Sequence, residues 1–178
     1  MRKALLFALC LAPSLAWAAP SEEDKLFADL AKCGSAEEAQ PIEDKLGNLF
    51  KVSNSPSVDL LMNRAAAALQ AADNATARKL IDSVTEVAPR YAEGWRQRAQ
   101  LQAASGDDTG AMISLQKAIE LNPRHFRALS ELAGMLEEYG DKAGALKLYR
   151  RVVALDPQMA GVERHEKALE KEVQGQGI

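Results

Sequence analysis

Cysteine, histidine and aromatic residues are scarce in this chain of 178 residues. It has two cysteines and two histidines, and aromatic residues make up 5% of it. The sequence also contains no Gly-rich phosphate loop, no pair of histidines at helical spacing, no Cys-x-x-Cys and no Gly-x-Ser-x-Gly. Metal sites and catalytic nucleophiles depend on such residues in such patterns. We therefore predict that the protein is not an enzyme and uses no cofactor and no metal.

An excess of positive charge and long apolar runs are also missing. The net charge is −3 and the pI is about 5.5, whereas a nucleic-acid binder usually presents a basic face. No segment after the N-terminus approaches the roughly 20 apolar residues of a transmembrane helix. The chain has 32 alanines, which favour helices, and only 11 glycines and 7 prolines, which argues against low-complexity disorder. The composition thus predicts a helical protein with no nucleic-acid partner and no transmembrane segment.

The N-terminus has the order of a secretory signal peptide. Two basic residues precede an apolar stretch over residues 4–12, which is about half the length of a membrane span and is followed by small residues. We expect a signal peptide over residues 1–18, cleaved after Ala18 or Ala19, with an uncleaved anchor as the alternative. The leader resembles those of Gram-negative bacteria, which implies the periplasm. Cleavage would leave Cys33 as the single cysteine, either a small buried residue or part of an intermolecular disulfide.

Prolines recur every 34 residues, at Pro89, Pro123 and Pro157. A Gly-Asp pair recurs with the same period, at 106–107 and 140–141. Proline stops a helix, glycine ends one in the left-handed conformation, and aspartate caps the next. The period therefore predicts a helical hairpin as the repeating unit. Small residues keep the same register where the two helices of a unit would cross: Ala65, Ala77, Ala99, Ala111, Ala133 and Ala145.

These columns resemble the tetratricopeptide repeat family, a 34-residue helix–turn–helix unit with an early Trp, small residues at the crossing and a final Pro. The resemblance implies an all-α, right-handed helical solenoid of about nine helices that serves as a protein-interaction scaffold. We expect a helical hairpin over 20–56 to cap one end and a helix over 160–174 to cap the other. Trp95 is expected to be a buried anchor of the middle unit. The three units are 58–91, 92–125 and 126–159.

The resemblance also implies that the first helices of the units line a concave, partner-binding groove. Some members bind C-terminal carboxylates there through Lys and Asn. This chain has Met62, Ala66, Gln97 and Glu131 in those places, so such a clamp is not expected. Charged side chains in the groove are expected to be exposed and to contribute little to folding. The candidate partner-binding residues are Asp59, Met62, Asn63, Glu93, Arg96, Gln97, Gln100, Arg127, Ser130 and Glu131.

Arg64 and Arg98 stand where the family usually has an apolar residue, which Leu132 retains. Their stems could lie along apolar surface while each guanidinium pairs with a carboxylate such as Asp82 or Glu120. Alternatively, the two arginines form an anion site, and the protein is a binding module for an envelope glycan or a phospholipid headgroup.

The scarcity of aromatic platforms for sugars favours a protein or peptide partner of unknown identity. The resulting prediction is a periplasmic interaction scaffold or adaptor that acts in cell-envelope assembly or integrity. A self-assembling structural protein is a third possibility, and the sequence leaves the oligomeric state open.

Overall fold

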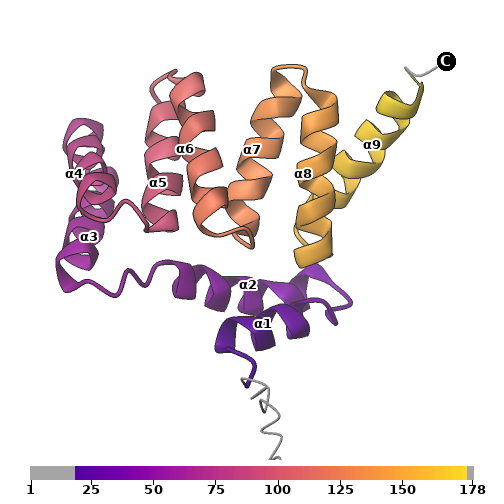
Figure 1. Ribbon diagram of the computed structural model, residues 1–178, viewed down its shortest axis with the longest axis horizontal. Coiled ribbons are helices and arrows are strands. Elements are labelled where there is room, and N and C mark those ends of the chain that lie inside the picture. Colours follow the sequence, from indigo (N-terminus) through magenta and orange to yellow (C-terminus); the bar gives the residue numbers. More distant parts are fainter. Residues whose placement is uncertain (1–18, 176–178) are drawn as a thin grey trace, which may run out of the picture.

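The computed structural model describes residues 19–175, which form nine α-helices and no strand (Figure 1). The predicted all-α helical solenoid is thereby confirmed, while the expected signal peptide over residues 1–18 lies outside the described residues. Within that described part of the chain, no helix is long and apolar enough to span a bilayer. The helices are α1 (Glu22–Leu30), α2 (Ala36–Phe50), α3 (Pro56–Gln70), α4 (Asn74–Val87), α5 (Ala92–Ala103), α6 (Asp108–Leu121), α7 (Phe126–Glu138), α8 (Lys142–Leu155) and α9 (Val162–Gly175).

The second helix of each repeat begins at the aspartate of the 34-residue period. The carboxylate accepts a hydrogen bond from the main-chain N–H three residues on, at 2.9–3.0 Å, which satisfies one of the unpaired donors at a helix N-terminus. The preceding residue has a positive φ, which Gly106 (φ +79°) and Gly140 (φ +84°) adopt without strain. In the first unit Ala72 takes the same conformation at φ +58°. The capping aspartates are Asp73, Asp107 and Asp141.

The alanine columns mark the place where the two helices of a unit are packed against each other. Every member is at most 1% exposed, because a larger side chain would hold the paired helices apart. Trp95, in contrast, is only partly buried and packs at the edge of the core formed by units two and three. Its indole Nε1 donates a hydrogen bond to the carbonyl of Pro89 at 3.0 Å. The largest fully buried side chain is instead that of Phe126.

The N-terminal hairpin, which we expected to cap one end of the repeat stack, packs in one buried cluster with α7, α8 and α9. Figure 1 shows α1 and α2 running beneath the stack, with α2 crossing one end of the repeat helices. Phe27 of α1 packs edge-on against Phe126 of α7, with ring centroids 6.3 Å apart. Leu30 and Leu46 belong to the same buried cluster, which extends into α8 and α9. Phe50 of α2 also contacts Phe126, and residues 51–55 then let the chain turn back toward α3.

Cys33 follows α1 and is partly buried against this cluster. Its thiol donates to the carbonyl of Asp29 at 3.5 Å, and its own carbonyl accepts from Nε2 of Gln158 at 3.1 Å. Burial, helped by neighbouring carboxylates, raises the pKa of the thiol. The thiolate form is therefore disfavoured at neutral pH.

Candidate interaction groove

Two hollows lie between successive first helices of the repeats, α3, α5 and α7, and together they form the groove. The first, about 490 Å³, lies between α3 and α5 and reaches the C-terminal end of α2. The second, about 550 Å³, lies between α5 and α7. Five of the ten sequence-predicted residues line the first hollow and three line the second. The first is lined by Asp59, Met62, Asn63, Glu93 and Gln97, and the second by Gln100, Ser130 and Glu131.

The apolar parts of both hollows come from small and flexible side chains. Met62, Leu69 and Ile81 contribute to the first hollow, beside Asn63 and Asp59. Ala103 and Met135 contribute to the second, whose charged lining residues Glu131 and Glu138 are both acidic.

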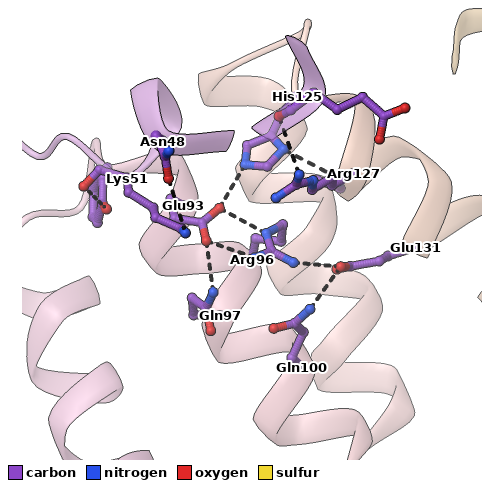
Figure 2. A network of polar contacts seen from close by, with 12 residues as sticks. Asn48, Lys51, Glu93, Arg96, Gln97, Gln100, His125, Arg127 and Glu131 are labelled. Atoms are coloured by element: carbon purple, nitrogen blue, oxygen red, sulfur yellow. Dashed lines mark hydrogen bonds and ion pairs between the residues drawn. The ribbon is translucent and has the colours of Figure 1, made fainter. Parts of the chain in front are cut away.

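A buried ion-pair network separates the two hollows, and Arg96 is its centre (Figure 2). Its Nε and Nη2 donate to the two carboxylate oxygens of Glu93 at 2.8 Å each. Its Nη1 donates to Glu131 on α7 at 2.6 Å. Arg96 is 7% exposed and Glu93 3% exposed. The expectation that these groove charges are exposed is therefore wrong for this pair, because one guanidinium is enclosed between two carboxylates from different helices.

His125 connects the network to the N-terminal hairpin. Its Nδ1 accepts the main-chain N–H of Ala128 at 3.4 Å, so Nε2 carries the proton and donates to Glu93 at 3.0 Å. The ring of Phe50, at the end of α2, lies 4.6 Å from the imidazole, centroid to centroid. A neutral imidazole satisfies all these contacts. Sequence reasoning missed this role because nothing local indicates that the cap of one helix contacts a carboxylate 32 residues earlier.

The two carboxylates of the network differ in their electrostatics. Burial disfavours the charge on Glu93, but hydrogen bonds from Arg96 and His125 outweigh it and lower the pKa of Glu93 well below its usual range. Burial raises the pKa of Glu131, and Arg96 only partly opposes this, since Glu93 takes two of the three guanidinium contacts. The same carboxylates raise the pKa of Arg96 despite its burial. The network thus contains a fully ionised inner pair and a second, more easily protonated carboxylate.

Two glutamines complete the network on the groove side. Nε2 of Gln97 donates to Glu93 at 2.8 Å, and Nε2 of Gln100 donates to Glu131 at 2.9 Å. The amide donors of these candidate residues are therefore already engaged within the protein. Together with Glu131 they form the ridge between the two hollows.

Arg127 points to the hairpin and does not line either hollow. Its Nη2 donates to the carbonyl of Glu43 at 3.3 Å and lies 3.7 Å from Asp44. The guanidinium lies over Gly47, where an added Cβ would be 2.6 Å from Nη1. Arg127 therefore holds α2 to α7, and we remove it from the candidate groove residues.

The structure does not bring Arg64 and Arg98 together in one anion site. Nε of Arg98 lies 3.0 Å from a carboxylate oxygen of Asp82, and its guanidinium lies 5.4 Å from the Trp95 ring centroid. Arg98 lines a small hollow with Arg78 on the side of the molecule where α4 meets α5. Arg64 is exposed on α3 and does not line that hollow.

Several residues near the first hollow were not expected from the sequence. The hydroxyl of Tyr91 donates to the carbonyl of Lys51 at 2.8 Å and holds the connector beside α5. Ser53 in that connector donates to Asp59 at 2.5 Å. Asn48 and Lys51 complete the lining at the end of α2. Only the folded position of the hairpin reveals Asn48, Lys51 and Ser53, because they precede the repeats in sequence.

The repeat region of this chain matches a known protein family. The family model described as Tetratricopeptide repeat matches residues 62–123 and 114–160, which together span more than half of the chain. The chain belongs to the tetratricopeptide repeat (TPR) family. TPR domains are in general non-catalytic modules that bind proteins or peptides.

One related sequence and two solved structures illustrate the similarity. A TPR repeat-containing protein of Rhizobium etli is 28% identical over 93 residues, 52% of this chain and 46% of that protein. The chain therefore spans less than half the length of that relative. The first TPR of Spaghetti, bound to an HSP90 peptide, superposes with a TM-score of 0.60 at 15% identity, over 66% of this chain and 93% of that one. The Yersinia enterocolitica type III secretion chaperone SycD, in complex with a peptide of the translocator YopD, has a TM-score of 0.59 at 16% identity, over 67% and 96%. Identities this low indicate the shared fold alone.

Proposed function

We propose that the protein is a periplasmic adaptor that binds a protein segment along the groove formed by α3, α5 and α7. The observation that carries the proposal is the pair of hollows between successive first helices, each with apolar lining. An extended segment could place one apolar side chain in each hollow and pass over the ridge formed by Gln97, Gln100 and Glu131. The peptide-bound TPR domains named above support this mode of binding.

The charges of the groove favour a neutral or basic segment. Arg96 is occupied by two carboxylates and Arg127 by α2, so neither offers a free cation to an acidic ligand. Asp59, Glu131 and Glu138 leave the lining acidic in balance, with Lys51 as the basic residue at one end. Lys and Asn, which some TPR domains use to clamp a C-terminal carboxylate, are replaced here by Met62, Gln97 and Glu131. We therefore expect the segment to be internal or basic.

The predicted leader supports a periplasmic location, and the periplasm suggests a role in envelope assembly or integrity. The competing glycan or headgroup module is not favoured, because its two arginines lie apart and Arg98 is paired with Asp82.

The test is site-specific crosslinking followed by paired blocking variants. A photo-crosslinking residue at Asn63 or Ser130, expressed in the bacterial periplasm, should capture the same partner, whereas one at the exposed Gln116 of α6 should not. Ala66→Arg and Ala103→Arg each fill a hollow from an exposed alanine and should abolish capture. Ala154→Arg is the matched control, because Ala154 is an exposed alanine of α8 that lines neither hollow. Full binding by both groove variants would refute the groove.

A further inference from the structure

The first unit exposes a helix face that the other two units bury. In the 34-residue register, Leu60 of α3 corresponds to Gly94 of α5 and to Ala128 of α7. Gly94 and Ala128 are buried, whereas Leu60 is 52% exposed. Ala67 is likewise exposed, although its counterpart Leu101 is buried. This stripe of α3, together with Arg64 between the two residues, is called the open face below.

In the second unit the corresponding face binds the preceding helix, α4. A Cβ added at Gly94 would lie 2.9 Å from a methyl group of Val84. Leu101 belongs to the same buried cluster as Ile81 of α4. Arg98, the counterpart of Arg64, lies 3.0 Å from the carboxylate of Asp82. The face is thus an established helix-docking surface elsewhere in the chain, with an acidic residue opposite the arginine.

Nothing in residues 19–175 covers the open face. The N-terminal hairpin, which precedes α3 in sequence, lies against α7 and α8 (Figure 1). In Figure 1, α3 and α4 form the free end of the stack. No ion pair involves Arg64 in this part of the chain, although its counterpart Arg98 has one. An exposed leucine thus lies beside an arginine that has no ion pair among the described residues, on a face that packs against a helix in both other units.

We propose that the open face docks an amphipathic helix of another protein, which takes the place that α4 has against α5. The helix carries a carboxylate opposite Arg64, as α4 carries Asp82 opposite Arg98. It also carries a small residue opposite Leu60, because Leu60 fills space that Gly94 leaves to Val84 in the second unit.

The other second helices of a repeat, α6 and α8, would not meet these requirements if a second copy of this chain supplied them. The residues that correspond to Asp82 on the other second helices are Gln116 of α6 and Arg150 of α8. Arg150 would oppose Arg64 with a like charge, and it already pairs with Glu170 of α9 at 2.6 Å. Self-stacking through α6 or α8 would therefore lack the ion pair that the α4–α5 junction has.

The experiment uses the full chain and a designed helical probe. The probe is a peptide of residues 74–88 with Val84→Ala, held helical by a side-chain staple because so short a helix is marginal in water. We expect it to bind the wild-type chain in isothermal titration. Arg64→Glu should weaken binding about fivefold or more, and a probe with Asp82→Lys should regain it on that variant. Arg164→Glu on α9 is the matched control, since Arg164 is also exposed.

Further measurements separate this surface from the groove and from self-association. Ala66→Arg and Ala103→Arg, which block the groove, should bind the probe as the wild type does. The proposal for the open face and the proposal for the groove can therefore be refuted independently. Circular dichroism establishes that each variant is folded. The absence of binding up to roughly millimolar probe, or binding that Arg64→Glu leaves unchanged, would overturn the proposal. A concentration-dependent dimer in light scattering that Arg64→Glu dissociates would overturn it in favour of a second copy.

Discussion

Arg96 and Glu93 form a bidentate ion pair one turn apart on α5, with both side chains buried and both N···O distances at 2.8 Å. The pair would be an ordinary surface salt bridge on an isolated helix. Here α7 supplies Glu131 on one side and His125 on the other, while Phe50 of α2 closes the site. Removing any one member therefore leaves a buried charge or donor without its partner.

Arg96→Ala is expected to lower the free energy of unfolding by about 3–5 kcal/mol, because it leaves the buried carboxylate of Glu93 without its charged partner and Glu131 without its ion pair. Arg96→Lys should cost less, since it keeps the charge but not the bidentate geometry. Urea denaturation monitored by circular dichroism measures both. The control is Arg90→Ala, an exposed arginine just before α5, which should change stability by less than about 0.5 kcal/mol. A similar small change for Arg96→Ala would show that the network contributes nothing.

Phe27→Ala should detach the N-terminal hairpin while the repeats stay folded. Phe27 is buried against Phe126, and the guanidinium of Arg124 lies 4.0 Å from its ring centroid, so its loss removes about 3–5 kcal/mol of docking free energy. Hydrogen exchange should show lost protection in α1 and α2 alone. Leu60→Ala, a change at an exposed apolar residue, is the control. Uniform loss of protection across α3–α8 would mean that the hairpin and the repeats unfold as one unit.

Raising the pH should weaken hairpin docking through Glu43 of α2 and Asp156 at the end of α8. Burial raises the pKa of both carboxyl groups, and the neighbouring Asp156 raises that of Glu43 further. Groups whose folded pKa is raised stabilise fully below the unfolded pKa, near 4, and lose that contribution as the pH rises through the folded pKa. Stability of the docked hairpin should therefore fall as the pH rises above about 4.

Glu43→Gln tests this pH dependence, because it removes the charge and retains the shape. The variant should reduce the loss of hairpin protection with rising pH, measured by hydrogen exchange corrected for intrinsic rates. Glu131 also has a raised pKa, so the comparison with wild type at each pH isolates the contribution of the hairpin pair. Equal pH profiles for the two proteins would contradict the assignment.

Ala72→Gly should stabilise the protein by about 0.5–1 kcal/mol. Ala72 has φ +58°, where a Cβ is strained, and the other two units have glycine at this place. Gly106→Ala, at φ +79°, should destabilise by a similar amount. Thermal unfolding of both variants shows whether each substitution stabilises or destabilises the protein. A destabilising Ala72→Gly would mean that the flexibility added to the unfolded chain outweighs the strain relieved.

The sequence by itself determined the repeat architecture of this protein. Pro89, Pro123 and Pro157 stop helices, Asp107 and Asp141 cap them, and the alanines set the crossing within each unit. These are local effects that depend on residues within one helical hairpin, and a 34-residue period repeats them three times. The positions of the two hollows followed from the same register, because successive first helices must lie side by side.

Only the tertiary structure decided where the hairpin lies and what the groove charges do. The apolar residues of α2 pack with Phe126 in a cluster that extends into α8 and α9, and nothing in the local pattern of α2 identifies that surface. Arg96 reaches Glu131 across 35 residues, and His125 reaches Glu93 across 32. Such contacts depend on how whole helices pack, so no local pattern distinguishes a buried, paired arginine from an exposed one. The open face of α3 has the same origin. It is exposed because the preceding hairpin packs against α7, α8 and α9 and not against α3.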